Sequence, residues 1–122
     1  GWLQSSYPEL TVNYPGLADS PCHEIAREQF HDRYGAILTL RTGSKESAFR
    51  LIDALKLPYI LSNIGDVRTL AIHPASTISL HSTKEQQENA GVFDDLIRIS
   101  VGIEDVEDLQ EDFEQALKQI KF

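Results

Sequence analysis

The chemically most informative residue of this chain is Arg98, which stands inside the apolar run from Leu96 to Glu104. The run is rich in β-branched residues and predicts a buried strand. A guanidinium keeps its charge, so its burial is unfavourable unless a carboxylate or phosphate accepts its hydrogen bonds. Two interpretations follow. Arg98 holds the carboxylate of a small substrate, or it lies at an edge where it reaches water or pairs with Glu104 or a helix carboxylate.

Two polar segments could supply further contacts to a ligand. The corner from Ser62 to Asp66 contains Asn63 and a glycine, so it could present a side-chain amide and backbone N–H groups to an anion. The loop from His73 to Ser79 offers hydroxyls, Thr77 among them, and one imidazole. Turns and strand ends of this composition are common, so composition alone favours an ordinary turn or strand cap in each segment.

The remaining histidines and the single cysteine form no pattern that indicates a metal or a catalytic set. His23, His31 and His81 lack metal-ligand spacing with one another or with carboxylates. Cys22 is the only cysteine, which excludes an internal disulfide and leaves too few thiolates for a structural zinc site. We therefore expect neither a metal site nor a complete catalytic set in this chain.

Length and charge restrict the class of protein. The 122 residues fit one domain with its own core, and the net charge of −8, with scattered basic residues, disfavours nucleic acid as a partner. No apolar stretch is long enough to span a membrane and no leader pattern is visible, so we expect a cytoplasmic protein. The chain lacks methionine and begins at Gly1, from which we expect it to be a piece of a longer protein.

Strand-like and helix-like patterns alternate along the chain. Alternating apolar residues bounded by turn residues predict strands at 9–14, 35–42, 59–61, 70–72 and 96–104. Helical spacing and capping residues predict helices at 20–32, 44–57, 82–90 and 105–120.

Several local details accompany these elements. We expect the first seven residues to form a loop, with Trp2 and Tyr7 packed on the body of this or another domain. In the helix that Ser20 and Pro21 open, the inner face should carry Ile25, Ala26 and Phe30. We expect Ser44 and Asp105 to cap their helices, and Ser82 with Glu85 to form a capping box.

The predicted elements indicate the fold class. Four or five strands with four helices favour an α+β domain of two layers, in which the helices cover one face of the sheet. The other face should stay partly open and, in a complete protein, would need a covering partner.

Six segments of the chain, in their order and spacing, resemble the C-terminal domain of O-acetylhomoserine sulfhydrylases. These enzymes belong to the pyridoxal-phosphate (PLP) dependent family of cysteine and methionine metabolism. The resemblance runs from about Val12 to Leu117. Its segments are Val12–Leu17, Ala48–Asp53, Ser62–Asp66, Ile72–Thr77, Ala90–Val92 and Asp95–Glu104.

The resemblance implies a fold, a reaction and roles for three residues. The fold would be a mostly antiparallel sheet with helices on one face, like the small C-terminal domain of fold type I PLP enzymes. Arg98 would form a bidentate pair with the substrate α-carboxylate, Asn63 would help to hold it, and Thr77 would be a further substrate-binding residue. The parent enzyme would convert O-acetylhomoserine and sulfide into homocysteine and acetate, a γ-replacement in methionine biosynthesis.

The chain also departs from the family pattern. Asn63 stands where many relatives have serine, which is similar to the sulfhydrylase branch, and Ile78-Ser79 replaces a common threonine-histidine pair, so that histidine's role is not transferred. The family attaches its cofactor to a lysine in a Ser-x-Thr-Lys motif of the large domain. Lys84 follows Ser82-Thr83, but His81 precedes them where the motif needs serine, and the segment lies where relatives begin a surface helix.

The resemblance thus implies that residues 1–122 form a single C-terminal domain that binds the substrate carboxylate. The large domain with the PLP site would be absent, so this fragment would carry no catalytic residue, bind no cofactor and be inactive alone. The complete enzyme would be a homotetramer. Its preference for acetyl or succinyl esters, its thiol donor, and replacement versus elimination stay open. The alternative is a free-standing α+β module that binds a small anion or regulates a partner chain.

Overall fold

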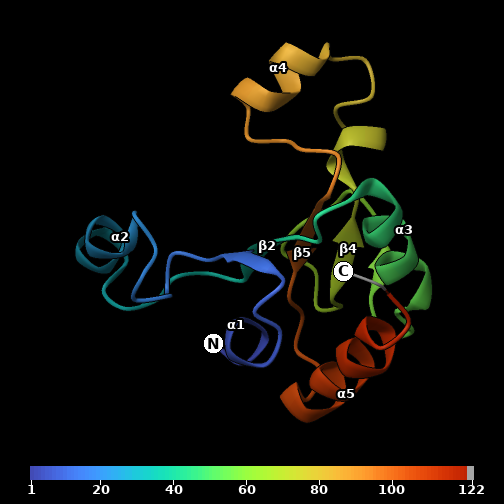
Figure 1. The fold of residues 1–122 in the computed structure, drawn as a ribbon. Helices are drawn as coiled ribbons and strands as arrows, with labels where there is room; N and C mark the ends of the chain where they lie inside the picture. The colour runs from blue at the N-terminus through green and yellow to red at the C-terminus, as the bar shows by residue number, and fades with distance from the viewer. Residues whose placement is uncertain (121–122) are drawn as a thin grey trace.

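Five strands form one mixed sheet in the order β1-β2-β5-β4-β3, in a computed structural model that describes residues 1–120 (Figure 1). The pair β3–β4 is parallel, and the other pairs are antiparallel. This arrangement confirms the expected α+β class and the mostly antiparallel sheet, although the strands are shorter than predicted. The strands are β1 (Thr11–Asn13), β2 (Ile37–Arg41), β3 (Tyr59–Ile60), β4 (Leu70–Ile72) and β5 (Leu96–Ser100).

Two helices, α3 (Lys45–Ala54) and α5 (Val106–Leu117), pack together on one face of the sheet, as expected (Figure 1). The Ser44 hydroxyl accepts a hydrogen bond from the Ser47 amide at 3.1 Å, which confirms the predicted cap of α3. Asp105 occupies the N-cap position of α5, but its side chain makes no capping hydrogen bond. Apolar residues from the two helices, the strands and both chain ends meet in the core: Leu10, Leu40, Ala48, Leu51, Ile52, Ile97, Ile99, Phe113, Ala116, Leu117 and Ile120.

The N-terminal segment corrects one prediction, because it forms the short helix α1 (Trp2–Ser6) instead of a loop. Five residues are too few for a stable helix by themselves, so tertiary packing must hold them. The Trp2 and Tyr7 rings meet edge to face with centroids 5.8 Å apart, and both pack against the core. The expected packing of these two rings on the domain is therefore confirmed.

Helix α2 (His23–Phe30) corrects two more predictions. It lies away from the sheet at the end of an excursion between β1 and β2 (Figure 1), so Ala26 is buried while Ile25 and Phe30 are 60% and 51% exposed. The expected inner face therefore has only one buried member. The helix also begins later than predicted, because a turn in which the His23 amide donates to the Ser20 carbonyl precedes it.

Helix α4 (Lys84–Asn89) has a capping box one residue beyond the predicted one. The Thr83 hydroxyl accepts from the Gln86 amide at 3.2 Å, and the Gln86 side chain accepts from the Thr83 amide at 2.9 Å. The amide of Ser82 instead closes the preceding turn on the Ser79 carbonyl, which moves the helix start along the chain. A single turn of 3-10 helix, η1 (Pro74–Ser76), follows β4. None of the described helices is long and apolar enough to cross a membrane.

Candidate site for a carboxylate on the open face of the sheet

Arg98 lies at the centre of β5, between Thr39 of β2 and Ile72 of β4. Side chains alternate between the two faces of a strand, so Arg98 points away from its fully buried neighbours Ile97 and Ile99. This alternation explains how a cation can occupy an apolar run. The helix-covered face takes the isoleucines, while the partly open face takes the half-buried guanidinium.

A hollow of about 520 Å³ lies on this open face, and we call it the Arg98 hollow. Three strands form its floor, and the segments after β4 and before β5 form its wall. The floor is mostly polar and the wall mostly apolar, a composition typical of sites for small amphiphilic ligands. Its lining residues are Thr11, Asn13, Thr39, Arg41, Pro74, Ile78, Ala90, Gly91, Val92, Phe93, Leu96 and Arg98.

The guanidinium of Arg98 contacts only neutral acceptors among residues 1–120. Its Nη2 donates to the Ser62 carbonyl at 2.7 Å and lies 3.5 Å from the Asn63 carbonyl. In the described part of the chain, no carboxylate lies within ion-pair distance of it. The interpretation in which Arg98 pairs with Glu104 or a helix carboxylate is therefore wrong, and the positive charge is left without an anionic partner in this part of the chain.

The 62–66 corner lies beside Arg98, but the groups that contact Arg98 differ from those expected. Carbonyl oxygens of Ser62 and Asn63 face the cation, and the Gly65 amide donates to the Ser100 hydroxyl at 3.1 Å. The Gly65 N–H is therefore not directed at an anion. The structure does bring Asn63 next to Arg98, as the prediction required, by way of its backbone.

Thr77 lies near the Arg98 hollow without lining it. Its exposed side chain donates to the His73 carbonyl at 2.7 Å, whereas the following Ile78 does line the hollow. The buried His73 ring contacts the Ser76 hydroxyl at 2.8 Å and the Asp94 carbonyl at 2.7 Å. His73 thus fastens the loop to the segment before β5, which matches the strand-cap alternative.

Arg41 is a second cation of the Arg98 hollow, which the sequence reasoning missed. It lies on the same face two residues along β2 from the Thr39 that pairs with Arg98. Unlike Arg98, its Nε donates to both Asp95 oxygens, at 2.9 and 3.2 Å, and its guanidinium lies 4.1 Å from the Phe93 ring centroid. The period of two along β2 was the available signal, but the partner carboxylate is too distant in sequence to have been found.

Glu104 fixes the segment after β5 through hydrogen bonds with Thr69. Burial raises the pKa of this carboxyl, but hydrogen bonds from the Thr69 amide, at 2.7 Å, and the Thr69 hydroxyl, at 2.8 Å, outweigh it and leave the pKa below its usual value. The Gly102 amide donates to the same hydroxyl at 2.9 Å. A Cβ on Gly102 would lie 2.4 Å from the Val67 carbonyl oxygen, so this close approach requires glycine.

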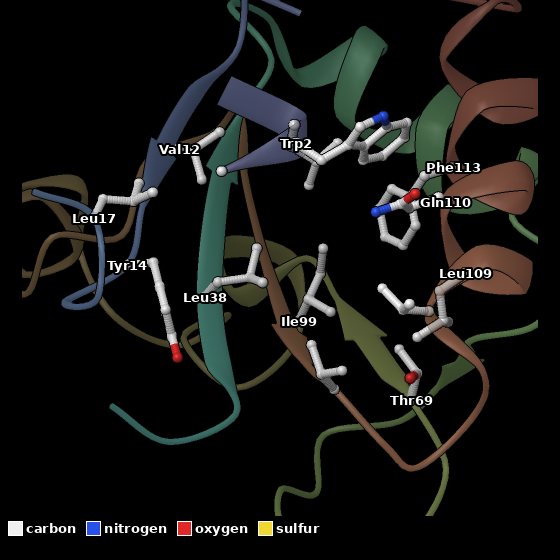
Figure 2. A pocket seen from close by; sticks show the side chains of 14 residues that line it. Trp2, Val12, Tyr14, Leu17, Leu38, Thr69, Ile99, Leu109, Gln110 and Phe113 are labelled. Atoms are coloured by element: carbon white, nitrogen blue, oxygen red, sulfur yellow. The ribbon is translucent and has the colours of Figure 1, made fainter. Parts of the chain in front are cut away.

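A second hollow, of about 280 Å³, lies on the helix-covered face between α1 and α5 (Figure 2). We call it the apolar hollow. Figure 2 shows Trp2 pointing toward Phe113 and Gln110 above a floor that includes Leu38 and Ile99. No acidic or basic side chain of the described residues lines it. It therefore offers a carboxylate no charged side chain, and the Arg98 hollow is the better candidate site.

The chain matches a family of known proteins in sequence. The sequence model of a family described as "Cys/Met metabolism PLP-dependent enzyme" matches residues 1–118. The chain is 46% identical over 117 residues to O-acetyl-L-homoserine sulfhydrylase 1 of Thermus thermophilus, covering 95% of this chain and 28% of the relative.

Solved structures of proteins with related names are also similar to this chain. The O-acetylhomoserine sulfhydrylase of Wolinella succinogenes is 42% identical with a TM-score of 0.77, covering 95% of this chain and 30% of that one. The yeast cystathionine gamma-lyase is 40% identical with a TM-score of 0.84, covering 89% and 28%. The chain therefore spans under a third of the length of these proteins, and the similarity extends to more than one named activity.

Proposed function

Because the chain belongs to the family of Cys/Met metabolism PLP-dependent enzymes, we propose that residues 1–122 are the C-terminal, substrate-carboxylate-binding domain of a longer O-acetylhomoserine sulfhydrylase. The longer protein would convert O-acetylhomoserine and sulfide into homocysteine and acetate. This γ-replacement would place it among the transferases and lyases of methionine biosynthesis. The 122 residues alone would be inactive.

The observation that carries the proposal is that Arg98, at the edge of a hollow of suitable size, has no anionic partner among residues 1–120. A planar guanidinium can donate two parallel hydrogen bonds to a carboxylate, which fixes both the position and the orientation of an amino acid. The neutral carbonyl of Ser62 accepts one such bond without compensating the charge. We propose that the substrate α-carboxylate supplies the anion that Arg98 lacks among residues 1–120, and that Asn63 and Thr77 also contact the substrate.

The described residues that line the Arg98 hollow do not by themselves fit PLP, because none of them is a lysine. Lys84, at the start of α4, instead pairs with Asp94 on the surface, with a side chain that is 62% exposed. We therefore assign the cofactor and its lysine to the part of the longer protein outside these residues, and we route no step of the reaction through this chain alone.

The surroundings of the Arg98 hollow support a covering partner. Ile64 in the 62–66 corner, Ile78 in the wall and nearby Leu80 are 54%, 55% and 60% exposed. Exposed apolar side chains around a polar site are typical of a surface that another part of a protein covers. We propose that the large domain of the longer chain covers this face and that the complete enzyme is a cytoplasmic homotetramer.

The test is Arg98→Ala in the longer enzyme. Loss of a charge-assisted bidentate pair should raise the KM for O-acetylhomoserine by about a hundredfold, while the absorbance spectrum of the bound cofactor stays unchanged. Arg50→Ala is the matched control, because Arg50 lies on the helix-covered side and pairs with Glu46 at the surface. An unchanged KM for Arg98→Ala would contradict the proposal.

A further inference from the structure

The 62–66 corner has little packing of its own. Ser62, Asn63, Ile64 and Gly65 are all exposed, and none belongs to a helix or strand. Such a segment keeps one position only if specific hydrogen bonds hold it. Its position matters because it carries Asn63 to Arg98.

Two side chains of β5 provide these hydrogen bonds. Arg98 donates to the Ser62 carbonyl at 2.7 Å, and Ser100 accepts from the Gly65 amide at 3.1 Å. Arg98 and Ser100 are alternate residues, so they lie on the same face of the strand. Ser100 is only 1% exposed, whereas Arg98 is half-buried and borders the Arg98 hollow.

These two attachments would respond differently to a ligand. A carboxylate accepts hydrogen bonds from a guanidinium more strongly than a neutral carbonyl does, so it would compete with Ser62 for the N–H groups of Arg98. The bond between Gly65 and Ser100 involves no charged group and would not be drawn into that competition. The attachment through Arg98 would weaken just when the corner is needed.

We propose that Ser100 is a positioning residue that keeps the 62–66 corner, and with it Asn63, on β5 while Arg98 binds a carboxylate. The inference rests on the proposed function in one respect, the binding of a substrate carboxylate by Arg98. Ser100 acts through the Gly65 amide and does not touch the substrate.

The first experiment needs no ligand and no activity. Hydrogen exchange at the Gly65 amide should be about fivefold to tenfold faster in Ser100→Ala than in the unaltered 122-residue chain, the change expected from the loss of one hydrogen bond. Ser44→Ala is the matched control, because Ser44 also accepts from a backbone amide at 3.1 Å but lies at the start of α3. Unchanged exchange at Gly65 in Ser100→Ala would overturn the inference.

The second experiment uses the longer enzyme. Ser100→Ala should raise the KM for O-acetylhomoserine about fivefold with little change in kcat, while Ser44→Ala leaves both unchanged. With 2-aminobutyrate, an amino acid without a leaving group, exchange across residues 62–66 should rise in Ser100→Ala and should not rise in the unaltered enzyme. An unchanged KM together with faster Gly65 exchange would show a purely structural hydrogen bond and overturn the positioning role.

Failure of the proposed function gives a different pattern. If Arg98→Ala leaves the KM unchanged, Arg98 does not bind the substrate and the role of Ser100 during binding fails with it. The exchange measurement on Gly65 would still report whether the hydroxyl of Ser100 holds the corner.

Discussion

The two faces of β5 differ sharply although their residues alternate along five positions. On the helix-covered face, Ile97 and Ile99 are 0% and 1% exposed and pack against core residues. On the open face, Arg98 borders a hollow and contacts two carbonyl oxygens. Leu96 and Ser100 flank Arg98 on this face and are buried, so under the proposed function Arg98 alone would contribute to binding there, while the helix-covered face contributes to stability. Substitutions on the two faces should therefore have different consequences.

The largest expected effect on folding comes from the helix-covered face. Ile97→Ala removes a fully buried side chain and should lower the free energy of unfolding by about 3 kcal/mol. Urea denaturation of the 122-residue chain measures this change. Ile103→Ala is the control, because Ile103 is 82% exposed and its truncation should change stability by less than about 0.5 kcal/mol. Equal effects of the two substitutions would contradict the core assignment.

The second-largest effect on stability should come from the hydrogen bonds of Glu104, beyond the end of β5. Glu104→Gln weakens the hydrogen bonds from Thr69 and should lower the free energy of unfolding by about 2 kcal/mol near neutral pH.

The pH dependence of this effect follows from the direction of the pKa shift. The folded-state pKa of Glu104 lies below its ordinary value of 4.5, so its contribution is fully present above that value and is lost as the pH falls through the folded-state pKa. The difference between wild type and Glu104→Gln should therefore shrink on acidification below pH 4.5. A difference that grows as the pH falls would contradict this assignment.

The caps of the two covering helices offer a smaller test. Ser44→Ala removes a capping hydrogen bond from α3 and should cost about 1 kcal/mol of unfolding free energy. Asp105 makes no side-chain cap at α5, so Asp105→Ala should cost less than half as much. Thermal unfolding of the two variants gives the comparison, and an equal loss in both would contradict the geometry of these caps.

The smallest expected effect on stability comes from the open face. Arg98→Leu removes a hydrogen bond to the Ser62 carbonyl but also relieves a half-buried charge that has no anionic partner among residues 1–120. These effects oppose each other, so the free energy of unfolding should change by less than about 0.5 kcal/mol. Arg41→Leu is the informative counterpart, because it breaks the ion pair with the mostly buried Asp95 and should cost about 1 kcal/mol. A large loss of unfolding free energy in Arg98→Leu would show that Arg98 stabilises the fold, and it would contradict the difference proposed between the two faces.

Local sequence patterns predicted much of this fold because they reflect local physics. The alternation around Val12, Leu40 and Ile99 marks strands, and the anomaly of Arg98 marks the candidate site. Predictions were wrong where distant residues decide the outcome. Helix α1 exists because its tryptophan packs on the core, and Phe30 is exposed because α2 extends away from the sheet.

The contacts of the candidate site were the least predictable feature. Arg98 was found because a charge in an apolar run stands out in one segment. Its contact with Ser62, the pairing of Gly65 with Ser100 and the ion pair of Arg41 each join segments far apart in sequence. A local pattern cannot specify such pairs, because the sheet topology decides which segments meet. The arrival of Asn63 beside Arg98 was expected only from the family resemblance.

The parallel pairing of β3 with β4 explains how that meeting arises. Two strands that run in the same direction cannot be joined by a tight hairpin, so the chain must travel back past the sheet before it re-enters. Here the return path, residues 61–69, passes over the open face and meets β5 at Arg98 and Ser100. The single parallel pair thus requires the connecting segment that contacts Arg98. In a sheet built only of hairpins, no such segment would cross this face.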